Sequence, residues 1–219
     1  APASVTKIMT LLLTLEAIGD GRISWDDTVT ASSHAESMRG SRVWLKAGEQ
    51  MSVRDMVKCV AVASANDCSV ALAEHIGGSE EAFVSMMNER AARLGMNDTS
   101  FVNACGLDAP GHYTSAYDVA LMSLELMKHE EIFDYTTIWM DSIRNGAFEL
   151  VNTNKMIRAY DGMMGLKTGY TSQAGYCLSA AARREDTTFL AVVLGGETSK
   201  TRNRDIAALL NYGFANYKE

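Results

Sequence analysis

Several patterns that define a function directly are missing from this sequence. It has no run of basic residues and no interleaving of basic with aromatic residues, and its formal net charge is -7, which argues against nucleic-acid binding. It has no Cys-x-x-Cys pair, so its four cysteines predict neither a zinc site nor a dense disulfide framework. No apolar stretch reaches the roughly eighteen residues of a membrane span. We also find no internal repeat, low-complexity tract or linker.

The chain does have enough apolar residues for a full core. Its 219 residues are 47 % hydrophobic, which fits one large domain or two small ones. We expect the cysteines to be small buried hydrophobic residues: Cys59, Cys68, Cys105 and Cys177. The histidines lack ligand spacing and an obvious carboxylate partner, so we expect surface or structural roles, and neither a metal nor a cofactor, for His34, His75, His112 and His129.

The stretch from Ala1 to Ile18 predicts a buried helix that carries a reactive pair. Pro2 suits a helix start, and the residues that follow Lys7 leave almost no polar face. Ser4 falls in the first turn, and Lys7 lies three residues later on the same face. An amine kept from water loses part of its preference for the charged form, so Lys7 could act as a base and Ser4 as a nucleophile. Alone, the pair fits equally well a capped helix with a lysine extended to solvent.

The remaining pattern predicts helices first and strands last, which is an α+β fold with a small antiparallel sheet backed by helices. We expect loop with short helical turns at 24–36, a short strand at 40–45, a helix opened by the capping box at 52–55, helices at 67–76, 79–94, 114–127 and 200–217, an ordered surface loop at 97–113 and a hairpin at Asn145-Gly146. The closing helix should present Ile206, Leu209, Leu210 and Phe214 on one face. Three strands are expected at 165–172, 175–183 and 187–195, the last apolar enough to be central.

Two further short motifs supply what an acyl transfer needs besides a nucleophile and a base. Ser64-Ala65-Asn66 lies between two predicted helices. Ser64 could pass a proton to the leaving group, and Asn66 could either hold Lys7 through its side-chain carbonyl or bind a substrate amide through its nitrogen.

The third motif, Lys167-Thr168-Gly169, lies on the strand that opens the sheet. Lys167 adds positive charge that would help to keep Lys7 neutral and would favour a substrate carboxylate, to which Thr168 offers a hydroxyl. Gly169 removes a side chain where a peptide could join the sheet edge. Alone, this motif equally fits a strand end with a turn glycine.

The order of the three motifs resembles the penicillin-binding proteins and class A β-lactamases. Nearly the whole chain is similar to the low-molecular-mass D-alanyl-D-alanine carboxypeptidases, through Ser4-Val-Thr-Lys-Ile-Met-Thr, Ser64-Ala-Asn-Asp-Cys-Ser-Val-Ala-Leu-Ala-Glu, Leu94-Gly-Met-Asn-Asp-Thr-Ser-Phe-Val-Asn, Gly106-Leu-Asp and Gly165-Leu-Lys-Thr-Gly-Tyr-Thr. The resemblance implies a DD-peptidase/β-lactamase-like fold and an extracytoplasmic enzyme. It also implies removal of the terminal D-alanine from peptidoglycan stem peptides through an acyl-serine intermediate, with β-lactams acylating the same serine.

The resemblance also implies roles for individual residues. The oxyanion hole would be the backbone N–H groups of Ser4 and Tyr170. Arg202 resembles the arginine that assists in binding the terminal carboxylate, although Arg204 lies two residues away and a solvated helix start is the alternative interpretation.

The sequence departs from this family at both ends. The family has a β-hairpin before the Ser-x-x-Lys helix, whereas only three residues precede Ser4. We therefore expect a trimmed or mature fragment, with 1–219 as a single catalytic domain that carries a helical subdomain at about 24–160. We also expect the strand at 187–195 to be covered by a hairpin on a separate fragment, a partner chain or a rearranged terminus. Many relatives carry a C-terminal β-rich domain and an amphipathic membrane anchor, which we would expect only in a longer parent protein.

Two other functions compete with a carboxypeptidase. A class A β-lactamase needs a deacylating glutamate before the Lys-Thr-Gly strand, and Glu149-Leu-Val-Asn152 matches that context only superficially. A non-catalytic module that binds D-Ala-D-Ala ends or β-lactams would not need Lys7, so the complete set of motifs favours an enzyme.

Overall fold

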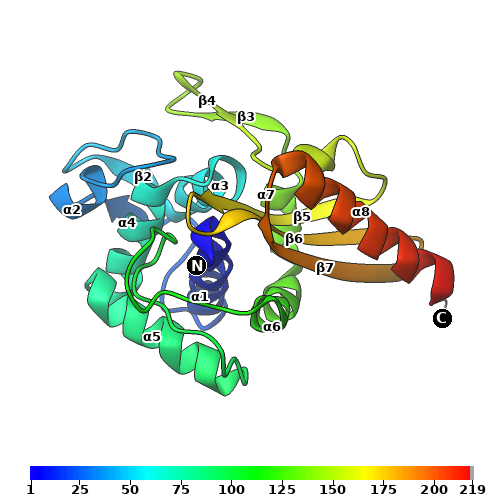
Figure 1. Cartoon of the computed structure of the whole chain (residues 1–219). Helices are drawn as coiled ribbons and strands as arrows, with labels where there is room; N and C mark the ends of the chain where they lie inside the picture. The colour runs from blue at the N-terminus through cyan, green and yellow to red at the C-terminus, as the bar shows by residue number, and fades with distance from the viewer. Residues whose placement is uncertain (218–219) are drawn as a thin grey trace.

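The computed structural model describes residues 1–217, in which helices surround a three-stranded sheet (Figure 1). The short 3-10 helices and α-helices are η1 (Ala3–Thr6), α1 (Lys7–Gly19), α2 (Ser33–Glu36), α3 (Val53–Ala63), α4 (Asn66–Gly77), α5 (Glu80–Arg93), α6 (Ala116–Met127), η2 (Glu130–Ile132), α7 (Phe133–Thr136), η3 (Lys155–Ile157) and α8 (Ser199–Asn216). The strands are β1 (Thr28–Thr30), β2 (Gln50–Ser52), β3 (Met140–Ile143), β4 (Phe148–Val151), β5 (Met163–Thr171), β6 (Gly175–Arg184) and β7 (Thr187–Gly196).

The three-stranded sheet is antiparallel, in the order β5-β6-β7. The prediction that 187–195 is the central strand is wrong, because β6 is central and β7 pairs only with β6 among the described residues. The physical reason is that α8 and α6 both pack against β7 (Figure 1). Apolar side chains along a strand indicate that its faces are buried, and here helices bury them. They do not show that both edges of the strand are paired with other strands.

Helix α1 passes through the main core, as its apolar sequence predicts. Ile8, Met9, Leu12 and Leu15 are all fully buried, and the cluster around them reaches α3, α4, α5 and α6. A second apolar cluster lies between the sheet and α8 and includes Leu178, Ile206 and Leu210. The prediction that Leu209 belongs to the apolar face of α8 is wrong, because this residue is 50 % exposed.

Helices α3, α5 and α6 each begin at a serine that caps the helix. The hydroxyl of Ser52 accepts the backbone N–H of Asp55 at 3.1 Å, and Ser79 and Ser115 cap α5 and α6 in the same way. Such caps satisfy N–H groups that have no partner inside the helix. The hairpin expected at Asn145-Gly146 is also confirmed, with β3 and β4 paired across it.

The segment 40–45 corrects another prediction, because it is irregular and forms no strand. Its backbone is held by Asp67, whose buried carboxylate accepts the N–H groups of Val43 at 3.1 Å and Leu45 at 3.0 Å. A two-stranded sheet forms elsewhere instead, between β1 and β2 on either side of this segment in the sequence. Strand β1 lies within 24–36, where we expected only loop and short helical turns.

The cysteines and histidines largely take the structural roles expected. All four cysteines are buried and free, and His112 is buried, with its ring nitrogens 2.9 Å from the Thr6 hydroxyl and the Val102 N–H. His34 differs, because its Nε2 lies 2.6 Å from a carboxylate oxygen of Glu80. Across residues 1–217, no helix combines the length and the apolar character needed to cross a bilayer.

The ion pair of His34 and Glu80 predicts a pH-dependent contribution to stability. The hydrogen bond to Glu80 raises the pKa of His34. A raised pKa means that the contribution is complete below the unfolded value of about 6.5 and is lost as the pH rises through the folded value. We expect His34→Gln to lower the free energy of unfolding more at acidic than at alkaline pH in urea titrations. An equal loss at every pH would contradict the assignment, and Glu80→Gln should show the same pH dependence.

Candidate active site

Ser4 and Lys7 meet at the start of the first helical segment, as the sequence predicts. Ser4 lies in η1 and Lys7 is the first residue of α1, and the Lys7 Nζ donates to the Ser4 Oγ at 2.8 Å. Lys7 is fully buried, whereas Ser4 lines an open pocket. The lysine therefore approaches the serine from the protein interior, and the hydroxyl faces the pocket.

Asn66 takes the first of the two roles considered for it, because its side-chain Oδ1 accepts from the Lys7 Nζ at 2.6 Å. The amide nitrogen of Asn66 donates to the carbonyl of Arg39 at 2.5 Å and so anchors the loop before Ser41. Ser64 ends α3 in the left-handed conformation, with φ of 61°, and α4 begins at Asn66. This sharp turn brings Ser64 to the wall of the pocket.

The backbone carbonyl of Cys105 is a third acceptor for Lys7, and no motif in the sequence indicates it. It lies 2.6 Å from the Lys7 Nζ. A lysine ammonium has three N–H donors, so Ser4, Asn66 and Cys105 together satisfy all of them. The expectation of a surface loop at 97–113 is wrong in its middle, where Ala104 and Cys105 are buried.

Strand β5 carries the third motif along the opposite wall of the pocket. Lys167 is buried and donates to the carbonyl of Thr168 at 3.0 Å. The Thr168 hydroxyl lies 2.7 Å from that of Thr153, a partner that sequence reasoning missed. A Cβ added at Gly169 would lie 3.0 Å from the Ser4 backbone nitrogen and 3.1 Å from that of Val5. Glycine therefore lets β5 pass close to the start of the Ser4 helix.

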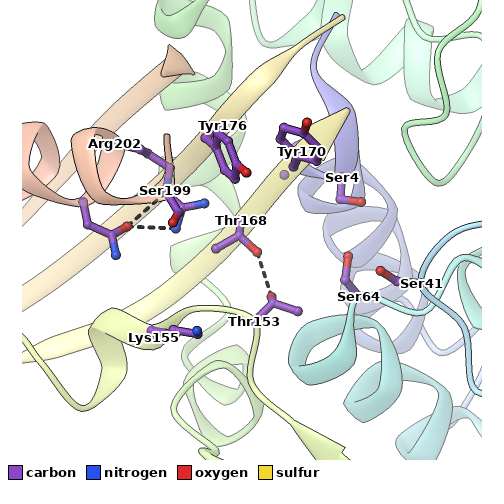
Figure 2. Close-up of a pocket in the computed structure, with 12 residues that line it drawn as sticks. Ser4, Ser41, Ser64, Thr153, Lys155, Thr168, Tyr170, Tyr176, Ser199 and Arg202 are labelled. Atoms are coloured by element: carbon purple, nitrogen blue, oxygen red, sulfur yellow. Dashed lines mark hydrogen bonds between the residues drawn. The ribbon is translucent and has the colours of Figure 1, made fainter. Parts of the chain in front are cut away.

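The motifs surround one pocket of about 350 Å³ (Figure 2). It is lined by Ser4, Ser41, Ser64, Thr153, Lys155, Thr168, Gly169, Tyr170, Tyr176, Ser199, Arg202 and Asn203. Figure 2 shows Ser4, Ser41 and Ser64 at one end and Arg202 with Ser199 at the other. Neither Asp nor Glu is among these residues. A pocket of hydroxyls and cations suits a substrate that carries negative charge.

Arg202 lies in the first turn of α8, at the end of the pocket opposite the serines. It is largely buried, and its guanidinium donates to the Asn203 Oδ1 at 2.8 Å and to the Cys177 carbonyl at 3.3 Å. The positive end of the α8 dipole lies beside it. Arg204, the alternative considered, is exposed and pairs with Asp205. Arg202 lines the pocket and Arg204 is exposed, so the geometry favours Arg202 as the arginine that could bind a carboxylate.

Burial governs the protonation of the two lysines. It lowers the pKa of Lys7 to about 8, an effect that Cys105 and Asp67 partly oppose. Burial also lowers the pKa of Lys167 well below its usual value, with further lowering from the charges of Lys7 and Arg202. Desolvation of Lys7, rather than the charge of Lys167, is thus the main cause of its reduced basicity. A carboxylate in the pocket would offset the repulsion among these cations.

The sequence and the fold of this chain are similar to those of known proteins. The profile of the peptidase S11 family, described as D-alanyl-D-alanine carboxypeptidase, matches residues 1–198. The chain belongs to this family. The expected resemblance and the α+β fold class are thereby confirmed.

Individual members of the family match most of the chain. It is 49 % identical over 221 residues to the D-alanyl-D-alanine carboxypeptidase DacF of Bacillus subtilis, covering 100 % of this chain and 57 % of that protein. The crystal structure of penicillin binding protein 5 from Haemophilus influenzae is similar with a TM-score of 0.93 and 34 % identity, covering 99 % of this chain and 64 % of that one. Penicillin-Binding Protein D2 from Listeria monocytogenes, solved in an ampicillin bound form, matches with a TM-score of 0.81 and 32 % identity, covering 97 % of this chain and 86 % of that one.

The chain thus spans little more than half the length of the first of these relatives. In the described residues, no group of three or more His, Cys, Asp and Glu side chains is arranged to hold a metal ion. Sequence reasoning missed Ser41, Thr153, Lys155, Tyr176, Ser199 and Asn203 in the pocket lining. Only their places in the fold bring them together, since none belongs to a motif.

Proposed function

We propose that this chain is a serine-type D-Ala-D-Ala carboxypeptidase, which removes the terminal D-alanine from peptidoglycan stem peptides. The observation that carries the proposal is the 2.8 Å contact between the Ser4 Oγ in the pocket and the Nζ of a wholly buried Lys7. A buried amine with a pKa of about 8 is about one-tenth neutral at pH 7, so it can accept a proton from a hydroxyl. Membership of the peptidase S11 family points to the same chemistry.

Acylation uses the pair directly. The neutral Lys7 takes the proton of the Ser4 Oγ, which attacks the carbonyl carbon of the penultimate D-alanine. The backbone N–H of Ser4 stabilises the oxyanion, since it lies in the first turn of η1, where N–H groups lack partners within the helix. Tyr170, on the edge strand β5, supplies the second N–H. The C–N bond then breaks, and the Lys7 proton reaches the leaving amine through the Ser64 hydroxyl. Water hydrolyses the acyl-serine in the second half of the reaction.

The other end of the pocket holds the terminal carboxylate of the substrate. Arg202, the Thr168 hydroxyl and the first turn of α8 supply charge and donors, and Lys167 adds positive charge behind the strand. Because β5 is an edge strand of its sheet, the peptide can lie along it as an added strand. Gly169 lets β5 pass close to the backbone of Ser4, so a peptide that lies along β5 comes within reach of the Ser4 Oγ. A β-lactam carries a carboxylate and a strained amide, so it acylates the same serine.

The two alternative functions have less support. Glu149 lies in β4 and is exposed, and it is not among the residues that line the pocket, so it is not placed to activate a deacylating water as a class A β-lactamase requires. A non-catalytic binding module would gain nothing from burying Lys7 against Ser4, because desolvating an amine costs stability.

The setting of the enzyme is part of the proposal. Since its substrate is peptidoglycan, we place the enzyme outside the cytoplasm. We propose that the chain acts as one catalytic domain in which about 24–160 is a helical subdomain, although residues 218–219 of the expected range lie outside the described residues. Among the described residues the outer edge of β7 has no partner strand, and we propose that a hairpin or a partner strand covers it. Sedimentation of the purified chain would reveal self-association through this edge.

Intact-protein mass spectrometry after incubation with a fluorescent penicillin tests the function. We expect one adduct per chain, mapped by proteolysis to the peptide that contains Ser4, together with release of D-alanine from a synthetic peptide that ends in D-Ala-D-Ala. Rapid loss of the adduct would instead indicate a β-lactamase. Binding of the peptide with neither adduct nor release would indicate a non-catalytic module.

Arg202→Gln tests the carboxylate end of the pocket. We expect KM for the D-Ala-D-Ala peptide to rise about 10- to 100-fold, because one charge-assisted hydrogen bond is lost. Arg204→Gln is the matched control, since it removes an exposed arginine of the same helix, and it should leave KM unchanged. Equal effects of the two substitutions would mean that only the general charge of α8 matters.

A further inference from the structure

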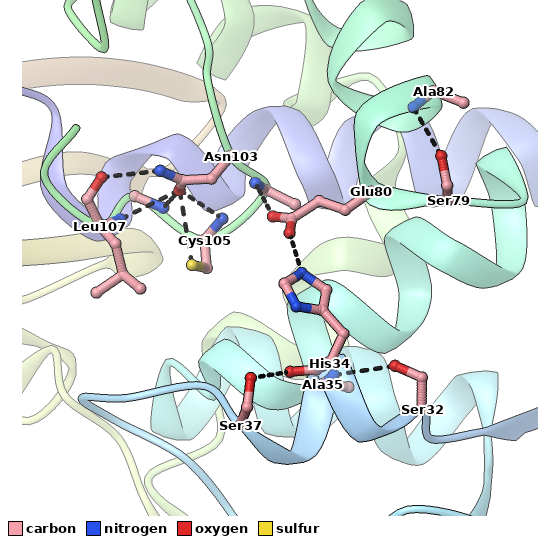
Figure 3. Close-up of polar contacts among 12 residues, drawn as sticks. Ser32, His34, Ala35, Ser37, Ser79, Glu80, Ala82, Asn103, Cys105 and Leu107 are labelled. Atoms are coloured by element: carbon pink, nitrogen blue, oxygen red, sulfur yellow. Dashed lines mark hydrogen bonds and ion pairs between the residues drawn. The ribbon is translucent and has the colours of Figure 1, made fainter. Parts of the chain in front are cut away.

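The buried loop Asn103–Leu107 supplies the Cys105 carbonyl that contacts Lys7, and the side chain of Asn103 shapes this loop (Figure 3). The Asn103 Oδ1 accepts the backbone N–H groups of Gly106 at 2.7 Å, Leu107 at 3.2 Å and Cys105 at 3.3 Å. The Asn103 amide nitrogen donates to the Leu107 carbonyl at 2.8 Å. The Asn103 side chain therefore supplies hydrogen-bond partners for backbone groups that have no backbone partner within this turn.

The loop is also fixed on the side that faces α1. The Ala104 carbonyl accepts from the Thr10 hydroxyl at 2.6 Å, and the Ala104 N–H donates to Glu80 at 2.9 Å. Gly106, at φ of 93°, passes so close to η1 that an added Cβ would lie 1.9 Å from the Ala3 carbonyl oxygen. The Cys105 carbonyl thus has little freedom to move relative to Ser4 and Lys7.

The direction of this carbonyl matters because a neutral amine has two N–H bonds and one lone pair. With Asn66 and Cys105 each accepting one N–H, at 2.6 Å, the lone pair of Lys7 is left to face the Ser4 Oγ at 2.8 Å. If the Cys105 carbonyl were displaced, the amine could rotate and the lone pair would leave the hydroxyl.

We propose that Asn103 is a positioning residue for the reaction, which holds the Cys105 carbonyl against Lys7 and so aims the base at Ser4. This inference rests on the proposed function, in which Lys7 is the base. A backbone carbonyl cannot be removed by substitution, so Asn103 is the side chain through which its position can be tested.

The experiment measures the acylation rate with a fluorescent penicillin as a function of pH. We expect Asn103→Ala to lower the rate about 10- to 100-fold, the effect of a misplaced catalytic group. We also expect its pH profile to move to lower pH, because the Lys7 ammonium loses an acceptor that stabilises its charge. Asn103→Asp keeps an oxygen for the three N–H groups and should retain most of the rate at its own pH optimum. Asn103→Gln, a milder displacement of the amide, should also shift the profile downward.

Asn88→Ala is the matched control, because it removes hydrogen bonds from the chain just before Asn103 without touching the loop Asn103–Leu107 itself. Asn88 accepts the Phe101 N–H at 2.8 Å and donates to the Phe101 carbonyl at 2.8 Å, two residues before Asn103. It should lower the thermal unfolding temperature without moving the pH profile.

The possible outcomes separate this inference from the proposed function. A wild-type chain that forms no adduct overturns both. A wild-type chain that labels at Ser4, with Asn103→Ala and Asn103→Gln profiles that stay in place or move upward, overturns only the positioning role. An equal shift in Asn88→Ala overturns it as well, since general loosening would then explain the effect.

Discussion

Ser4→Ala is expected to abolish covalent labelling by penicillin and release of D-alanine. The proposed reaction passes through a bond to the Ser4 Oγ, and no other lining hydroxyl contacts a lysine in the described structure. The amino group of Lys7 would remain, but an amine so deeply buried cannot reach a ligand in the pocket. Intact-protein mass spectrometry over several hours, with circular dichroism to confirm folding, makes the measurement.

The control for this prediction is Ser172→Ala. Ser172 is exposed and follows β5 directly, so its loss changes a serine near the pocket without altering the reacting pair. It should label at the wild-type rate. Undiminished labelling of Ser4→Ala would show that the nucleophile had been assigned to the wrong residue, and peptide mapping would then locate the correct one.

The three motifs could be recognised in the sequence because each consists of side chains at fixed local spacing. Ser4 and Lys7 share one helical face whatever the rest of the chain does, so their contact follows from helical geometry alone. Serine caps at Ser52, Ser79 and Ser115 are equally local, and the helices that they begin were predicted correctly.

The features that sequence reasoning missed depend on contacts between distant parts of the chain. The Cys105 carbonyl is a backbone group, which any residue type could supply, so no residue pattern marks it. The segment 40–45 contains the apolar run Val43-Trp44-Leu45, but the Asp67 carboxylate accepts the N–H groups of Val43 and Leu45, and the segment pairs with no strand in the described structure. Leu209 is likewise exposed although Ile206 and Leu210 of the same helix are buried, and the apolar spacing in the sequence does not distinguish these residues.

Lys7→Met should lower the acylation rate about 10²- to 10⁴-fold while leaving the pocket intact. Methionine fills a similar apolar volume, so the change removes the base with little disturbance of the core. The size of the effect follows from the usual contribution of a general base. Because the proton acceptor is the neutral amine, the wild-type rate should rise with pH around the Lys7 pKa of about 8. The Lys7→Met variant should lose this rise, which stopped-flow fluorescence across a pH series would reveal.

The pH profile separates a base from a merely electrostatic lysine. If Lys7 acted through its positive charge, the wild-type rate would fall as the pH rises above about 8, since the amine loses its charge there. Lys46→Met, which removes an exposed lysine, controls for the loss of one positive charge and should leave both the rate and the profile unchanged. A falling wild-type profile would therefore overturn the role proposed for Lys7, even with Ser4 established as the nucleophile.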